Sequence, residues 1–185
     1  RQIIIRNAQG NEKFISLDGQ EFLLKGQELV IADAEGPIAL AGIVGGKNSG
    51  ISDKTIQVFI EAAHFQPYVV RKTAREFGIN TDSSYRFARG VDPDGVLRAM
   101  DLVCALIQQW AGGSIYGDPY DLYPEPHLPK PIAIHISTVS DRLGYDLDAE
   151  SFVKTMRALH CSVDAVVESG NIQSPGKFKV VPPAF

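Results

Sequence analysis

A proline-rich segment limits what this chain of 185 residues can fold into. Residues 117–131 contain five prolines, and each one fixes φ and removes a backbone donor, so neither a helix interior nor a central strand can run through them. Such a stretch is typical of an extended linker between folded parts. We therefore predict a larger domain over residues 1–117, a linker over 118–131 and a small module over 132–185. Both ends lie next to strand-like residues, so we expect a piece of a longer polypeptide.

The larger part begins with short β-prone stretches separated by turn residues. Asp18-Gly19 between two such stretches is a strong hairpin signal. The predicted strands are Ile3–Arg6, Lys13–Leu17, Glu21–Leu24, Leu29–Ala32, Ile38–Ala41 and Val58–Ile60.

Helical periodicity dominates the remainder of this part, and the small module mixes both types of element. In order, we predict a helix from Pro67 to Gly78, a polar loop over 80–93, a helix over 94–111, a strand Ile132–Ile136, a helix Ser137–Leu143 capped by Ser137, a helix Asp148–His160 and a hairpin of Val163–Val167 with Phe178–Val181. The apolar stripe from Val96 to Trp110 is expected to pack into the core. The predicted class is α+β: a mixed sheet domain packed with helices, followed by a small α+β module.

A single carboxylate, Glu61, interrupts the apolar run over residues 56–65. Residues 58–60 favour a strand, and a strand that is apolar on both faces is expected to be buried on both. A carboxylate removed from water must be paired, protonated or engaged by a polar hydrogen. Glu61 is therefore a candidate acceptor in a polar pocket or the partner of an arginine such as Arg86 or Arg89.

Small residues dominate the nearby stretch 39–46, Ala-Leu-Ala-Gly-Ile-Val-Gly-Gly. They let the backbone approach a ligand closely, and glycine permits positive φ. An acceptor beside this backbone wall would form a pocket for a small polar group. A tight turn or a bulge is the alternative use of the same glycines.

Composition excludes several classes of function. The net charge of −4 argues against broad binding to nucleic acid, although residues 71–98 carry six cations against four acidic residues. This excess could guide an RNA end, and ordinary solvated helix faces explain it equally well. No stretch approaches the roughly 20 apolar residues that span a bilayer. The distant Cys104 and Cys161 indicate buried free thiols in a reducing cytoplasm, and the scattered histidines predict no metal site.

Several ordered motifs together resemble one family, the β subunit of bacterial phenylalanine–tRNA ligase. They are Leu40–Gly46, Gly50–Asp53, Phe59–Ala63, Arg71–Arg75, Gly78–Ser84 and Tyr85–Pro93. These match the B3/B4 region of that family, and residues 131–185 resemble the start of its B5 module. The chain departs from the family at Ala88, where Glu is usual and where a local ion pair is lost.

The resemblance implies a cytoplasmic α2β2 heterotetramer that attaches phenylalanine to tRNA(Phe) with ATP and magnesium. Its B3/B4 region hydrolyses tyrosine that has been attached by mistake. Such a site is needed because a hydrophobic pocket rejects an added hydroxyl poorly, whereas an acceptor left unpaired beside phenylalanine is costly. The resemblance implies no cofactor for this piece alone and no membrane.

Carried over by position, the resemblance makes Glu61 the acceptor for the tyrosine hydroxyl. Ala41 and Gly42 correspond to backbone that lines the pocket, and Gly45 to a place where a large side chain blocks entry. The loop facing the pocket is matched by Thr81, Ser83 and Ser84, with Ser83 where the family often has Ala.

The resemblance assigns no catalytic residue, because hydrolysis in the family relies on a positioned water and the tRNA end. It also places a His and Asn/Thr segment of the editing site before Arg1, and acidic magnesium ligands shared with the α subunit after Phe185. We therefore expect weak or no activity from this piece alone. The alternatives are a non-catalytic RNA- or protein-binding scaffold and, more distantly, a free-standing acyl hydrolase, for which no nucleophile constellation is present.

Overall fold

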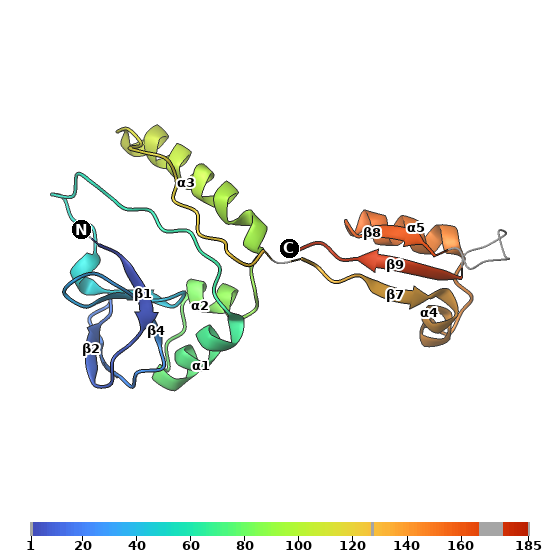
Figure 1. The fold of residues 1–185 in the computed structure, drawn as a ribbon, viewed down its shortest axis with the longest axis horizontal. Helices are drawn as coiled ribbons and strands as arrows, with labels where there is room; N and C mark the ends of the chain where they lie inside the picture. Colours follow the sequence, from blue (N-terminus) through green and yellow to red (C-terminus); the bar gives the residue numbers. More distant parts are fainter. Residues whose placement is uncertain (1, 127, 167–175, 185) are drawn as a thin grey trace. The chain divides into compact units, whose positions relative to one another are not determined.

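The computed structural model describes residues 2–126, 128–166 and 176–184 and consists of two compact units, residues 1–121 and 122–185 (Figure 1). The division falls inside the proline-rich segment, of which residue 127 lies outside the described residues. Antiparallel sheets and helices occur in both units, so the predicted α+β class is confirmed.

An antiparallel sheet of four strands forms the centre of the first unit. Its order is β1 (Ile4–Asn7), β4 (Leu29–Ala32), β5 (Pro37–Leu40) and β6 (Val44–Gly45). β2 (Glu12–Ile15) and β3 (Glu21–Leu24) form the hairpin that Asp18-Gly19 predicts, and Gly19 has a φ of +86° in its turn. A bridge between Ser16 and Gly46 joins this hairpin to β6.

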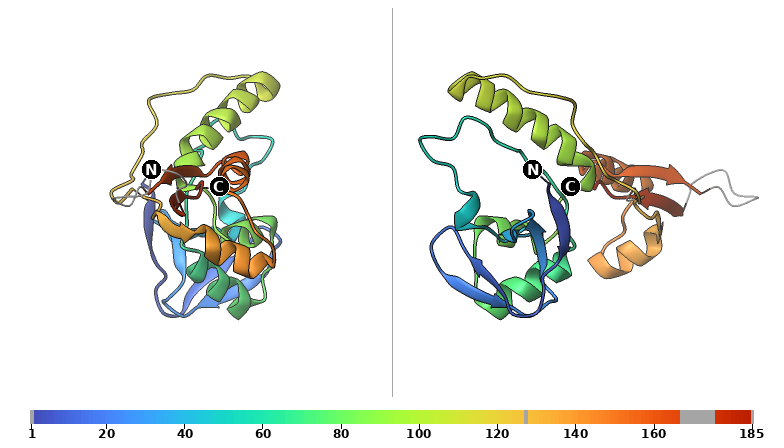
Figure 2. Two further views of the ribbon diagram at one scale, coloured as in Figure 1. Left: turned by 90° about the vertical axis from the view of Figure 1, so that its right-hand side faces the viewer. Right: turned by 60° about the vertical axis from the view of Figure 1, so that its left-hand side comes forward.

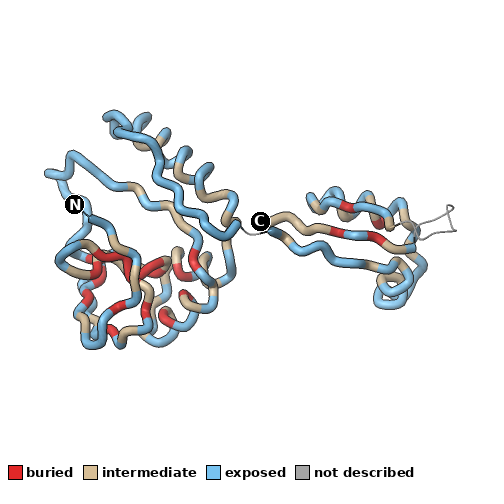
Figure 3. Tube along the Cα trace, in the orientation of Figure 1, coloured by how far each residue is buried: buried red, intermediate tan, exposed pale blue. Residues whose placement is uncertain are grey.

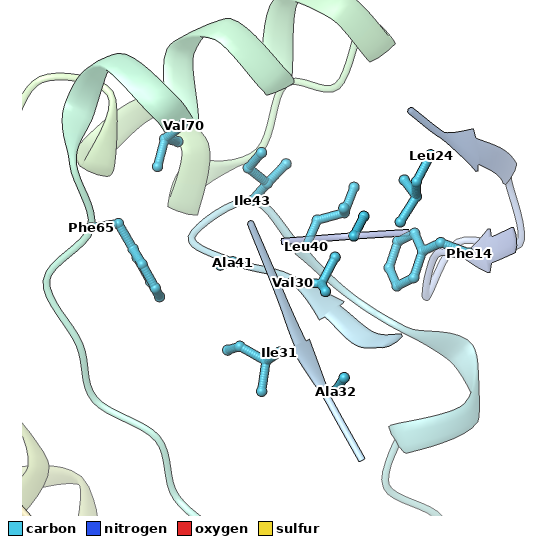
Figure 4. Packing of buried hydrophobic residues seen from close by; sticks show 11 residues of the cluster. Phe14, Leu24, Val30, Ile31, Ala32, Leu40, Ala41, Ile43, Phe65 and Val70 are labelled. Carbon is cyan, nitrogen blue, oxygen red and sulfur yellow. The ribbon is translucent and has the colours of Figure 1, made fainter. Parts of the chain in front are cut away.

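The core of the first unit lies between the sheet, the hairpin and the helices α1 (Pro67–Phe77) and α2 (Asp82–Phe87). Figure 4 shows Phe14 and Leu24 at one end of this cluster and Val70 of α1 beside Ile43 at the other. α1 begins with Pro67 in its first turn and ends at Gly78 in the left-handed conformation, as the sequence predicts.

Two local predictions for this unit are wrong. The stretch 56–60 forms no strand, and Ile56 and Phe59 are 95% and 77% exposed. A strand needs a ladder partner, and among the described residues this stretch has none. The predicted loop 80–93 contains α2, because Thr81 caps a helix there, and the two-residue strand β6 was not predicted.

The long helix α3 (Val96–Ala111) follows a 3₁₀ turn, η2 (Pro93–Gly95), and another 3₁₀ turn, η1 (Lys47–Ser49), follows β6. In Figure 2, α3 and α1 lie at opposite ends of the first unit. The predicted burial of the apolar stripe of α3 is wrong, because none of the helix's residues is buried (Figure 3). Trp110 is 76% exposed. The sheet core is covered by α1 and α2 instead. Neither α3 nor any other described helix has the length and apolarity needed to cross a membrane.

The second unit packs two helices against a sheet of three strands ordered β7-β9-β8. Its elements are β7 (Ile132–His135), α4 (Ile136–Leu143), α5 (Ala149–Ala158), β8 (Ser162–Ala165) and β9 (Lys177–Val181). β9 pairs with β8 as expected and also with β7; Val167 of the predicted hairpin lies outside the described residues. His135 occupies the N-cap of α4, so the predicted cap at Ser137 is wrong, whereas Gly144 ends that helix as predicted.

Candidate functional site

A pocket of about 670 Å³ lies in the first unit, between the end of the sheet, the extended segment 61–65, α2 and the start of α3. Its lining residues are Ile31, Ala39, Leu40, Gly42, Ile43, Val44, Gly45, Glu61, Ala62, Ala63, Phe65, Ser83, Phe87, Val91, Asp92, Gly95, Val96 and Ala99. A volume of this size suits a small organic group such as an amino acid.

One wall of the pocket is formed by the turn between β5 and β6. Gly42 has a φ of +69°, and a Cβ on it would lie 2.6 Å from Cδ2 of Phe65, so only glycine fits there. At Gly45 a Cβ would meet no atom within 4 Å, so a side chain there would extend into open space beside the pocket. A tight turn and a pocket wall are therefore not alternatives for these glycines, because the turn itself forms part of the wall.

The start of α2 holds this turn in place. The Ser83 hydroxyl donates to the Gly42 carbonyl (3.0 Å), and the Thr81 hydroxyl donates to the Ile43 carbonyl (2.7 Å). Thr81 and Ser84 also form a capping box, in which each side chain accepts a hydrogen bond from the other residue's backbone N–H. Backbone carbonyls that would otherwise lack a donor are therefore satisfied by the helix cap.

Two aromatic rings form an apolar surface of the pocket. Phe65 and Phe87 pack edge to face with centroids 4.9 Å apart, and both line the pocket. An apolar surface beside a few polar groups is the usual composition of a small-molecule site.

Glu61 lines the same pocket on the extended segment. The residue as a whole is exposed, but partial burial of its carboxyl disfavours the charged form and raises its pKa above the ordinary glutamate value. No described residue forms an ion pair or hydrogen bond with this carboxylate. Arg86 pairs with Asp82, and Arg89 donates to the Tyr85 carbonyl, so neither arginine provides the ion pair considered as an alternative.

The structure brings together four of the seven residues that the sequence indicated. Glu61, Gly42, Gly45 and Ser83 line the pocket. The other three lie nearby without lining it: Ala41 is buried in the core, and the hydroxyls of Thr81 and Ser84 are used in the cap.

Sequence reasoning missed Phe65, Phe87 and Asp92 as lining residues. Asp92 caps η2, and its Oδ2 lies 3.4 Å from Nη2 of Arg98. The available signal for Phe87 was the N-cap at Thr81. A helix that begins there places Phe87 on the same face as Ser83, four residues earlier.

Residue types that bind metals are common in this chain but do not cluster in its described part. Within residues 2–126, 128–166 and 176–184, no cluster of three or more His, Cys, Asp or Glu residues could hold a metal ion. Both cysteines are unpaired and half-buried, less buried than the sequence suggested.

Comparison with known proteins gives the same family as the sequence motifs. The B3/4 domain family matches residues 1–112. The chain is 51% identical over 185 residues to the phenylalanine–tRNA ligase β subunit of Bdellovibrio bacteriovorus, covering 100% of this chain and 22% of that protein. It is 48% identical over 158 residues to the subunit of the same name from Carboxydothermus hydrogenoformans (85% of this chain, 20% of that protein) and 40% over 144 residues to that of Thermotoga maritima (78% and 18%).

The chain thus spans about a fifth of the length of these relatives. The match of the domain family covers more than half of the chain and all of the elements that surround the pocket. The chain therefore belongs to the B3/4 domain family.

Proposed function

We propose that this chain is part of a phenylalanine–tRNA ligase β subunit and that its pocket edits tyrosyl-tRNA(Phe). One observation carries the proposal: the carboxylate of Glu61 lies at a largely apolar pocket and has no partner among the described residues. The names of the relatives supply the context, since all three described above are β subunits of phenylalanine–tRNA ligase.

Discrimination between tyrosine and phenylalanine follows from that carboxylate. A tyrosyl ring resting on Phe65 and Phe87 would direct its hydroxyl to Glu61, which accepts the hydrogen bond. A phenylalanyl ring would desolvate the same carboxylate and give it nothing in return. The pocket therefore favours the amino acid that the synthetic site rejects poorly.

Hydrolysis of the ester requires a water molecule to add to the acyl carbon and the bond to the ribose oxygen to break, which releases tyrosine and the tRNA hydroxyl. The serines near the pocket are poor nucleophiles for this step. The Ser83 hydroxyl donates to a carbonyl, and Ser84 is used in the cap, so no described base accepts a proton from either. The role left to the chain is to bind and orient the aminoacyl group beside the attacking water.

The activity of the whole enzyme is part of the same proposal. It comprises attachment of phenylalanine with ATP and magnesium, an α2β2 assembly with the α subunit, and binding of tRNA(Phe). No described residue cluster fits a magnesium ion, so no step is assigned to a metal in this chain. Residues 132–185 would then belong to the B5-like module that follows the editing domain.

The test is deacylation of tyrosyl-tRNA(Phe) by the complete α and β subunits. Glu61→Ala is expected to slow deacylation by about 10- to 100-fold, the value of a hydrogen bond to a charged group, while attachment of phenylalanine persists. Glu35→Ala is the matched control, because Glu35 is exposed and its carboxylate lies away from the pocket.

Equal deacylation by the Glu61→Ala and Glu35→Ala enzymes would contradict the role of Glu61. Absence of deacylation from the unmodified enzyme would favour the non-catalytic scaffold instead.

A further inference from the structure

Three arginines, two on α1 and one just after α2, have no carboxylate partner among the described residues. Arg71, Arg75 and Arg89 are exposed, and none forms an ion pair with a described residue. Most other cations nearby are neutralised: Arg86 pairs with Asp82 and Arg98 with Asp92. In a chain of net charge −4, this is a local concentration of uncompensated positive charge.

An aromatic ring lies among these arginines. The Arg89 guanidinium carbon stacks 3.5 Å from the centroid of the Tyr85 ring, and Tyr85 is 53% exposed. Arg71 donates to the Ala88 carbonyl at the end of α2 (2.7 Å), so it lies next to Arg89 in space as well. Arg75 lies one turn along the same face of α1. We call Arg71, Arg75, Tyr85 and Arg89 the arginine–tyrosine patch.

This patch is connected to the pocket by α2 itself. Ser83 and Phe87 on one face of the helix line the pocket, whereas Tyr85 on another face is exposed. Beyond the helix, Val91 lines the pocket only two residues after Arg89. A chain molecule bound on the patch would therefore lie close to the pocket rim.

We propose that the arginine–tyrosine patch binds the unpaired 3′ nucleotides of an RNA whose terminal ester enters the pocket. Guanidinium groups pair with phosphate oxygens through parallel N–H donors, and an exposed ring backed by arginine offers a surface on which an unpaired base stacks. An acidic peptide would use the charges and leave the ring unexplained. The proposal rests on the editing function proposed above and adds the surface that holds the RNA.

The test separates binding of RNA from chemistry in the pocket. The complete α and β subunits are assayed with tyrosyl-tRNA(Phe) and with tyrosyl-adenosine, an ester that has no phosphate. Arg75→Gln, Arg89→Gln and Tyr85→Ala are each expected to raise the KM for tyrosyl-tRNA by roughly 3- to 10-fold. Deacylation of tyrosyl-adenosine should be unaffected by Arg75→Gln, and each arginine lost should reduce the salt dependence of RNA binding by a slope of about 0.7.

Control variants distinguish charge from ring stacking. Lys13→Gln removes an exposed cation on β2 that forms no ion pair with a described residue, and it should leave the KM for both substrates unchanged. Arg75→Lys should restore the KM only in part, because its charge is kept and the parallel donors of the guanidinium are lost. Tyr85→Phe should behave like the unmodified enzyme, because its ring is kept.

A direct measurement covers the case in which the unmodified enzyme deacylates nothing. Fluorescence anisotropy of a short single-stranded RNA on the complete subunits should then still show weaker binding for Arg89→Gln than for Lys13→Gln. The proposal is overturned if the patch variants and Lys13→Gln share one KM, one RNA affinity and one salt slope. Loss of binding to the α subunit with unchanged RNA affinity would also overturn it, since the patch would then be a protein interface.

Discussion

Burial raises the pKa of the Glu61 carboxyl, and no cation in the part of the chain that the structure describes offsets this. A raised pKa in the folded state means that the fold binds a proton more tightly than the unfolded chain does. Its contribution to stability is therefore present below the pKa of an unfolded glutamate and is lost as the pH rises through the folded value. We predict that Glu61→Gln is more stable than the unmodified protein near about pH 7 and that this advantage disappears near about pH 4.

Urea unfolding across that pH range measures the effect, with Glu35→Gln as the exposed control. If the stability advantage of Glu61→Gln were the same at both ends of the pH range, that result would contradict a raised pKa of Glu61 in the folded protein. For function, the same titration predicts weaker selection for tyrosine at acidic pH, where a protonated Glu61 is a poorer acceptor.

Gly42 and Gly45 form a matched pair for testing the pocket wall. Gly42→Ala should destabilise the protein by about 1–3 kcal/mol, because its φ is positive and the new methyl group meets Phe65. In Gly45→Ala the new methyl group has no atom within 4 Å, so the free energy of unfolding should change by less than about 0.5 kcal/mol. Comparison of urea midpoints decides this, and equal costs at both positions would contradict the geometry of the turn.

Among the elements, the short helix α2 both lines the pocket and holds the turn beside it. Thr81→Ala removes both the cap to Ser84 and the hydrogen bond to the Ile43 carbonyl. We predict a loss of about 1–2 kcal/mol in stability and faster amide exchange at the turn between β5 and β6. Thr55→Ala, which removes a hydroxyl from an exposed turn, is the control; equal exchange in both variants would show that α2 does not hold the turn.

Elements whose signals are local were predictable from sequence. The hairpin of β2 and β3 and the ends of α1 depend on Asp18-Gly19, Pro67 and Gly78, each of which acts within one turn of chain. The run 56–60 has the composition of a strand, yet a strand also requires a neighbour that no local pattern reveals. The buried Glu28 shows the same limit, because its carboxylate accepts hydrogen bonds from the backbone of Lys25, Gly26 and Gln27, and that loop geometry exists only once the chain has folded.

The candidate site was predictable in part for the same reason. Glu61 and the glycines stand out by residue type. The aromatic surface of Phe65 and Phe87 does not, because it forms only where two segments meet.

At the scale of the whole molecule, each unit has a separate hydrophobic core. Phe178 is buried in the second core against Phe152, with ring centroids 5.3 Å apart. We predict that Phe178→Ala destabilises residues 122–185 by about 3–5 kcal/mol and leaves the unfolding of residues 1–121 unchanged. Hydrogen exchange followed by mass spectrometry on peptides from each unit provides the readout, and exchange that increases equally in both units would show one cooperative fold.

The wall formed by the turn between β5 and β6 also affects how such a pocket can be redesigned. At Gly42 the wall is main chain, and a substitution there is blocked by Phe65 and by the positive φ. New ligand preferences can come from lining side chains beside this turn, such as Glu61 on the extended segment and Ser83 on α2, or from a side chain added at Gly45. A mutational library at Glu61 and Gly45 would change the groups offered to a ligand without removing a hydrogen bond that holds the turn, whereas each change at Ser83 also removes its bond to the Gly42 carbonyl.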